Sequence, residues 1–348
     1  MHHKRKNKYI PPPPKTVYSG SVLGQLVSFI FFISILVIGF CAYFYQDEFK
    51  AKDVVLSDEL SNIVSSLHLT GRADVILRAT HPELQQKQEF NQSCNSHNHE
   101  IYVLGCYRED QDRLFVFNVT SKELPGVREV TTAHELLHAV YHRLFFWEKD
   151  ELDKQLQEAY DQLPQDSDLR TSMQHYRSDE FYNELHSRIG TEIPHLSDSL
   201  ERYYAKFFQN RSKIVNFNEQ YHGVFSRLKA ETEALKASIE NKKQLIERRA
   251  NEYRQHRQQL NNDIIQFNAD ANSGRFQNQD LFLSQRELLL QRTKQLKAEY
   301  EQLKTETESL NQDIEKYNQN IYHNSELIDQ INSNSIPKVI DHSPSTKP

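Results

Sequence analysis

Apolar and polar positions divide the chain into three regions with different patterns. From Val22 to Tyr45 nearly every residue is apolar or small, and no charged residue occurs between Lys15 and Asp47. As a helix this run would be about 36 Å long, which is enough to cross a bilayer. The first region therefore predicts a transmembrane signal anchor over residues 21–46, preceded by a basic, proline-containing tail over residues 1–20.

Residues 47–218 form the second region, in which short amphipathic patterns alternate with β-rich runs. The two β-rich runs are separated by a short polar segment, which is typical of a β-hairpin. The expected elements are a helix from the N-cap Ser57 through His68, an extended piece at 74–77, a helix at 82–90, strands at 101–107 and 113–119, and helices at 126–145, 151–163, 166–176, 178–189 (ended by Gly190) and 197–208.

In the third region, residues 219–333, apolar side chains recur at alternating spacings of four and three, the pattern of a coiled coil. Residues 268–280 contain Asn272-Ser273-Gly274 and interrupt this pattern. The region predicts an antiparallel helical hairpin with arms of about 50 residues, roughly 70 Å long. With a turn centred near Gly274, Asp263 is expected to lie close to Arg286. Residues 334–348 are expected to be a disordered tail.

The charge distribution narrows the functional classes. The formal net charge is −6, and all five lysine and arginine residues before residue 47 lie in the tail. The positive-inside rule then predicts a cytoplasmic N-terminus, with the remaining chain outside the cell membrane. No basic face for nucleic acid emerges, so nucleic-acid binding is not expected.

The strongest chemical signal is His134-Glu135-Leu136-Leu137-His138. Two histidines four residues apart on a helix lie within roughly 40° of each other and about 6 Å along the axis, so both imidazoles can bind one metal ion. Glu135 would lie beside the ion, where its carboxylate can take a proton from a water activated by the metal. This is the H-E-x-x-H signature of zinc hydrolases, and it predicts one Zn²⁺ per chain.

Catalytic zinc usually has three protein ligands and one open position. The segment Tyr182-Asn183-Glu184-Leu185-His186-Ser187, 45 residues beyond His138, resembles the N-E-x-x-S/A segment in which the gluzincin clan of zinc metallopeptidases carries its glutamate ligand. The resemblance covers residues 126–145 and 178–189 only. It implies a zincin-like domain in which His134, His138 and Glu184 bind zinc and Glu135 is the general base.

Other residues compete for these roles. Glu180 lies one turn before Glu184 and could be the third ligand or a neighbour of it, and Glu192 and His142 are further alternatives. His186 could donate a hydrogen bond to the oxyanion of the transition state, but a plain surface histidine is the favoured interpretation. Outside the apolar run, the cysteines Cys94 and Cys106 are expected to form a disulfide.

Together these features predict a mostly α, α+β chain: a transmembrane helix, a zincin-like catalytic domain at 47–218 with a small β-hairpin or sheet, and an antiparallel coiled-coil hairpin at 219–333. The leading hypothesis is a membrane-anchored zinc metallopeptidase that acts on peptides or proteins. The coiled coil could bind a protein partner or drive self-association. The alternatives are a structural adaptor with an inactive metal-binding domain, and a zinc amidase that acts on cell-wall peptides.

Overall fold

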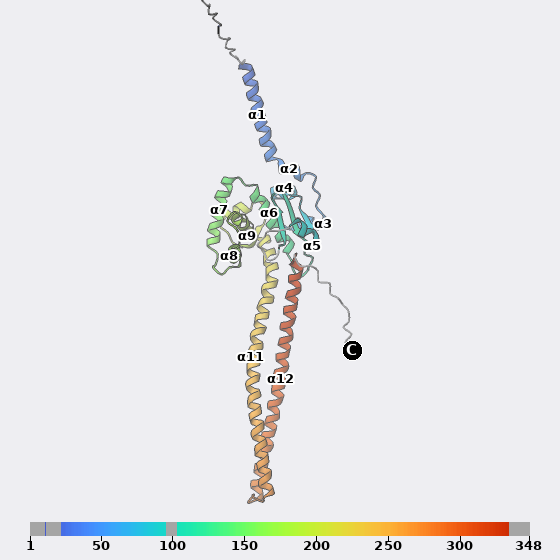
Figure 1. Cartoon of the computed structure of the whole chain (residues 1–348), viewed down its shortest axis with the longest axis vertical. Helices are drawn as coiled ribbons and strands as arrows, with labels where there is room; N and C mark the ends of the chain where they lie inside the picture. The colour runs from blue at the N-terminus through green and yellow to red at the C-terminus, as the bar shows by residue number, and fades with distance from the viewer. Residues whose placement is uncertain (1–10, 12–21, 95–102, 334–348) are drawn as a thin grey trace, which may run out of the picture.

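The computed structural model describes residues 11, 22–94 and 103–333, so both predicted terminal tails lie almost entirely outside the described residues. The described chain is mostly helical, with one small sheet and one long helix pair (Figure 1). The elements are α1 Val22–Phe44, α2 Gln46–Ala51, α3 Asp58–Ser66, α4 Gly71–Ala79, β1 Glu83–Gln85, α5 Lys87–Ser93, β2 Gly105–Arg108, β3 Arg113–Phe117, α6 Val127–His142, α7 Phe146–Asp161, α8 Asp168–Met173, α9 Phe181–Glu192, α10 Asp198–Tyr204, α11 Arg211–Asn272 and α12 Gln279–Ile331.

The predicted transmembrane segment 21–46 is contradicted, and with it the predicted single-pass placement in the cell membrane. Among the side chains that the structure describes, no helix combines the length and the apolar character that crossing a membrane requires. The predicted fold class is therefore wrong in this element.

The sheet has three strands in the order β1-β3-β2. Strands β2 and β3 pair antiparallel, with Cys106 opposite Phe115, which confirms the predicted hairpin. Strand β1 pairs parallel with β3, in a segment where a helix over 82–90 was expected. The helix there, α5, begins only at Lys87. Among the described residues, β2 is paired on one side only, so it is an edge strand.

Helix α6 lies at the centre of the domain. One side packs on β2 and β3 and another on α9, and its apolar side chains Leu136, Leu137 and Ala139 are fully buried. Such burial on several sides explains the uncharged residues around the two histidines. The domain is thus built around the helix that carries the metal-ligand motif.

Two local predictions, an extended piece at 74–77 and a helix end at Gly190, are wrong. Residues 74–77 belong to helix α4 and not to an extended piece, because the Thr70 side chain caps the helix by accepting a hydrogen bond from the Ala73 N–H. Gly190 lies inside α9 and does not end it. A Cβ at this position would lie 2.5 Å from a Leu137 methyl group, so the glycine allows close contact between α9 and α6.

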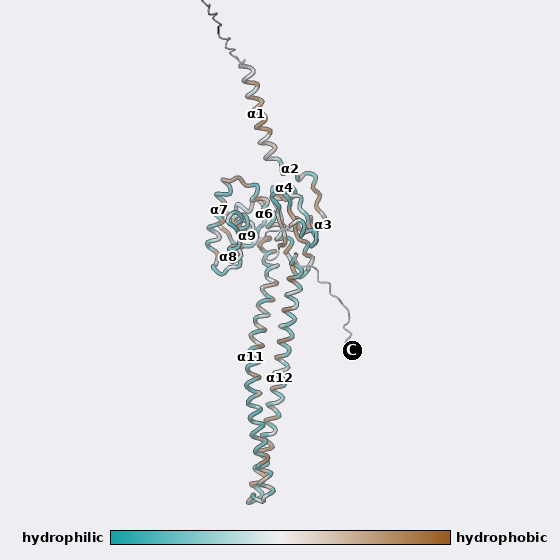
Figure 2. Tube along the Cα trace, in the orientation of Figure 1, coloured by the Kyte–Doolittle hydropathy of each residue, from teal (hydrophilic) through white to brown (hydrophobic). Residues whose placement is uncertain are grey.

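The helix pair is continuous with the domain. Helix α11 has 62 residues, about 90 Å by the helical rise, and begins at Arg211 because its first turns are part of the domain core. Helix α12 has 53 residues and returns to the domain, where Leu327 and Ile331 are buried beside Phe90 and Phe117. Figure 2 shows that both arms are mainly hydrophilic between the domain and the turn.

A ladder of polar pairs sets the register of the two arms. Residues on α11 at intervals of seven face residues on α12 at intervals of seven: Lys242 with Asp313, Arg249 with Glu306, His256 with Glu299, and Asp263 with Arg292. This spacing is that of a heptad repeat. Asp263 therefore pairs with Arg292, and the predicted pairing with Arg286 is wrong. The difference arises because the turn follows Asn272 and α12 starts only at Gln279.

Candidate metal centre

Helix α6 presents His134 and His138 from adjacent turns. Their Nε2 atoms are 3.1 Å apart and both side chains are largely buried. No proline or glycine interrupts α6, so the i, i+4 spacing is kept as the sequence predicts. The two imidazole nitrogens are close enough to bind the same ion.

Helix α9 brings Glu184 to this pair. Glu184 Oε2 lies 3.7 Å from His134 Nε2 and 3.4 Å from His138 Nε2, and the residue is only 6% exposed. Ligand atoms bound tetrahedrally to one zinc ion lie about 3.3 Å from each other. Among the described residues these three side chains form a group that could hold a metal ion.

Further contacts orient these ligands. Asn183 Oδ1 lies 3.0 Å from His138 Nδ1, so it can accept that N–H and leave the lone pair of Nε2 directed at the ion. Arg188, one turn after Glu184, places its Nε 3.9 Å from Glu184 Oε1. Arg188 is held in turn by Glu192 at 2.7 Å. Asn183, which contacts His138, and Arg188, which contacts Glu184, therefore both belong to α9.

Electrostatics support a role for these groups as ligands. Burial alone would lower the pKa of His138, but the Glu184 carboxylate raises it to about 9. Burial favours the neutral form of Glu184, yet the two imidazoles hold the pKa of Glu184 well below its usual range. Glu184 Oε1 is buried with no hydrogen-bond partner among the described residues. The other oxygen, Oε2, faces the imidazole nitrogens from a carboxylate buried as an anion, and such a group is a donor that a cation would satisfy.

Glu135 lies against the edge strand β2. A Cβ added to Gly105 would be 2.7 Å from Glu135 Oε1, so only glycine leaves room for the carboxylate at this position. Burial has the largest effect on the pKa of Glu135 and raises it, although the imidazoles of His138 and His134 act to lower it. The side chain is therefore fixed beside the ligand pair by the main chain of β2.

Two cavities open on this group. The first has a volume of about 500 Å³ and lies between α6, α8, α9 and α11, with Asn218, Tyr221 and His222 of α11 in its wall. The second, of about 850 Å³, follows β2 and the start of α9. Four residues line both cavities: Gly105, His134, Glu135 and Tyr176. The candidate metal centre thus lies where the two cavities meet.

The competing residues lie elsewhere. Glu180 lines the second cavity but is not part of the ligand group, and Glu192 is engaged with Arg188. His142 lies 3.6 Å from Glu109, away from the imidazole pair. His186, on α9, is fully buried, with its Nε2 3.1 Å from the Tyr203 hydroxyl. It lines neither cavity. For the predicted oxyanion role, the imidazole of His186 would have to line one of the two cavities, where a substrate could bind.

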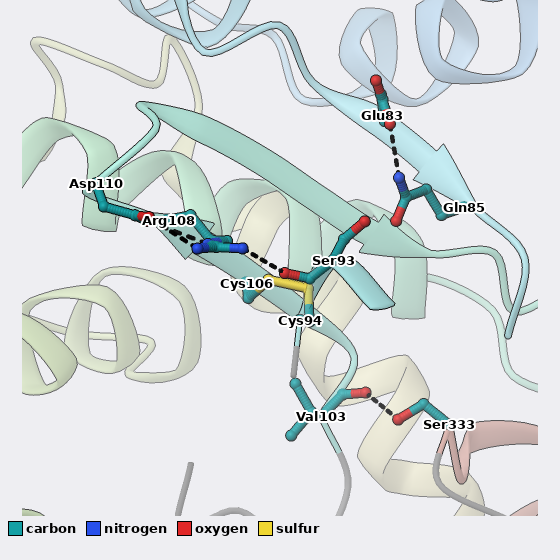
Figure 3. Close-up of a disulfide and its surroundings, with 9 residues drawn as sticks. All are labelled: Glu83, Gln85, Ser93, Cys94, Val103, Cys106, Arg108, Asp110 and Ser333. Carbon is teal, nitrogen blue, oxygen red and sulfur yellow. Dashed lines mark hydrogen bonds and ion pairs between the residues drawn. A yellow bond between two sulfur atoms is a disulfide. The ribbon is translucent and has the colours of Figure 1, made fainter. Parts of the chain in front are cut away.

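A disulfide forms one edge of the second cavity. Cys94, at the end of α5, is bonded to Cys106 on β2, which confirms the predicted pairing. Figure 3 shows this bond next to the contact in which the Ser333 hydroxyl donates to the Val103 carbonyl at 3.0 Å. The edge strand is therefore tied to α5 by the disulfide and to the end of α12 by a hydrogen bond.

An ion-pair network supports the other end of the strand. Arg143, at the C-terminus of α6, is 13% exposed in its side chain. It donates to both carboxylate oxygens of Asp47 at 2.9 and 3.0 Å, and to both of Asp112 at 2.9 and 3.0 Å. Asp112 lies in the turn between β2 and β3 and also accepts a hydrogen bond from the Tyr107 hydroxyl. This network joins α2, α6 and the β-hairpin into one unit.

Several residues of the site carried no individual signal in the sequence. Gly105 and the wall residues of α11 are distant from the motif along the chain. Arg188 could have been noticed, because Glu184, Arg188 and Glu192 recur every four residues on one face of a helix. Comparison with protein-family models, with curated proteins and with solved structures found no match. The chemistry of the site is therefore the basis for assigning a function.

Proposed function

We propose that the protein is a gluzincin-like zinc peptidase in which His134, His138 and Glu184 bind Zn²⁺ and Glu135 is the general base. The observation that carries the proposal is the convergence of the three ligand atoms within 3.7 Å of each other, beside a buried glutamate and at the junction of two cavities. Two imidazoles and one carboxylate, with a position left for water, are a frequent ligand set of catalytic zinc.

The bound ion would supply Lewis acidity that brings the pKa of a water molecule towards neutrality. Glu135 is suited to accept the proton of that water, because burial raises its pKa above that of an ordinary carboxylate. Its position is defined before substrate arrives, since the side chain lies closely against Gly105 of β2. Asn183 keeps His138 in the tautomer that ligation needs.

The edge strand offers a binding mode for a polypeptide. Strand β2 has one unpaired edge among the described residues and lies beside the base. An extended peptide can add to such an edge by main-chain hydrogen bonds, which do not depend on its sequence. Side chains on either side of the scissile bond would then enter the two cavities, which supports a peptide substrate.

The test is a metal and activity assay on the purified full-length chain. We expect one zinc per chain in the wild type, loss of zinc in His138→Ala and in Glu184→Gln, and retention in Glu180→Gln, the matched control on the same helix. Glu135→Gln should keep its zinc and lose cleavage of a mixed peptide library by at least 10²-fold. A zinc-loaded wild type that cleaves no peptide, or zinc retention in Glu184→Gln, would refute the proposal.

A second candidate is an adaptor in which the helix pair α11–α12 is the working part. It is favoured by the apolar side chains near the turn, where Ile265, Leu283 and Leu288 are 60%, 47% and 55% exposed. Exposed apolar groups of this kind are typical of interaction surfaces. Loss of a phenotype on substituting these residues, with no effect of Glu135→Gln, would favour the adaptor.

A further inference from the structure

The two cavities beside the metal centre are rich in carboxylates. The lining acidic residues are Glu135, Asp168 and Glu192 in the first cavity, and Glu109, Glu135, Asp179, Glu180 and Glu184 in the second. The only lysine or arginine side chains among the described lining residues are Arg188 and Arg108. Seven carboxylates against two guanidinium groups leave a formal excess of five negative charges. A divalent ion at the centre would reduce this excess to three.

Each of these two arginine side chains already has a carboxylate partner. Arg188 is bound by Glu192 at 2.7 and 3.1 Å, and Arg108 by Asp110, which lies outside the cavities, at 2.7 Å. Some lining carboxylates also have partners: Glu109 has His142 and Asp179 has Arg177. Neither guanidinium is therefore available to attract an acidic ligand.

Besides the proposed base Glu135, two lining carboxylates have no ion-pair partner among the described residues: Asp168, at the start of α8, and Glu180, at the start of α9. Asp168 lines only the first cavity and Glu180 only the second, and the two cavities share His134 and Glu135. His134 lines both cavities, and His138 and Glu184 line the second, so both cavities adjoin the group that could hold a metal ion. A ligand that spans both cavities would meet one unpaired carboxylate on each side.

We infer that this cleft binds polypeptide segments that carry lysine or arginine on both sides of the bond placed at the metal centre. The inference rests on the proposed peptidase function and specifies its substrate class. A cleft lined by one sign of charge attracts ligands of the opposite sign and raises their association rate. Asp168 and Glu180 are the specificity-determining residues in this account, one for each side of the bond.

The test measures binding separately from cleavage. Zinc-loaded full-length Glu135→Gln protein is titrated into fluorescein-labelled peptides of equal length in which the positions flanking one central bond are lysine, glutamine or glutamate. Fluorescence anisotropy should show the lysine peptide binding at least about tenfold more tightly than the glutamate peptide at low salt. The difference should shrink as added salt shortens the Debye length to about 8 Å.

Asp168→Asn together with Glu180→Gln should reduce the preference for lysine at least about threefold, whereas Glu158→Gln should leave it unchanged. Glu158 is an exposed carboxylate on α7 that lines neither cavity. Equal binding of the lysine and glutamate peptides, or a preference that persists in the double variant, would overturn the inference. If zinc-loaded wild type binds the lysine peptide selectively but never cleaves it, the charge preference stands and the peptidase proposal fails.

Discussion

Replacing Gly105 by alanine tests the position of Glu135, the proposed general base. The added Cβ would lie 2.6 Å from Thr131 Cγ2 and 2.7 Å from both Cγ and Oε1 of Glu135. Ordinary contacts begin at about 3.5 Å, so the carboxylate and the strand must separate by roughly 0.8 Å. We therefore expect the substitution to act on the base directly while leaving the three metal ligands in place.

The size of the effect follows from this displacement. Inserting one methyl group into a close-packed site costs about 1–3 kcal/mol, offset by up to about 1 kcal/mol because alanine restricts the unfolded chain. The expected loss of folding stability is about 1–2 kcal/mol in urea denaturation. A base moved by about 1 Å should lower kcat/KM on the order of 10²-fold. Zinc content should remain one per chain.

Gly71→Ala is the matched control. Gly71 is the exposed first residue of α4, and a Cβ there has no neighbour within 4 Å. The control should change stability by less than about 1 kcal/mol and leave both zinc content and activity unaltered. If Gly105→Ala matches wild type in stability and activity, the carboxylate of Glu135 does not lie against β2 and the reasoning about its position is wrong.

Four further predictions concern zinc binding, the pH dependence of stability, the ion pairs and the disulfide. Zinc binding at pH 7 should release at least about one proton, because ligation requires neutral imidazoles, the pKa of His138 is raised to about 9, and that of His134 is also raised. Calorimetry in buffers with different ionisation enthalpies measures this release, and its absence would contradict the shift. In the metal-free protein the same raised pKa stabilises the fold most below about pH 6.5, and this contribution is lost as the pH rises through 9. Arg143→Gln should cost about 2–3 kcal/mol in urea denaturation, since it leaves the largely buried carboxylate of Asp47 unpaired and removes one of the two cations that Asp112 contacts, the other being Lys50; wild-type stability in this variant would show that the network is dispensable. Replacing both Cys94 and Cys106 by alanine should cost about 3 kcal/mol, as estimated for the 12-residue separation that the bond closes, and an unchanged denaturation midpoint in oxidising buffer would contradict this.

Local periodicity made part of the architecture predictable. The i, i+4 spacing of His134 and His138 depends only on helix geometry, and α6 keeps it because no helix-breaking residue interrupts it. The heptad pattern predicted two paired helices, which the structure contains as α11 and α12. The disulfide was predictable because only two cysteines lie outside the apolar run.

The boundaries between elements were less accessible from the sequence. Residues 82–90 contain a helical pattern, but Glu83–Gln85 pair with β3 because the sheet offers hydrogen bonds to that segment. The turn of the helix pair and its register depend on the polar ladder between arms, so Asp263 meets Arg292. Such pairings join residues distant in sequence, and local propensity does not specify them.

What the sequence by itself determined is the chemistry of the candidate centre: two imidazoles and a glutamate on one helix, with a small set of carboxylates as candidates for the third ligand. Only the tertiary structure decided among them. The packing of α9 on α6, made close by Gly190, turns Glu184 towards the imidazoles while Glu192 is held by Arg188. The same packing brings Gly105 against Glu135 and α11 into the cavity wall, because contacts between distant segments form only when the core closes around α6.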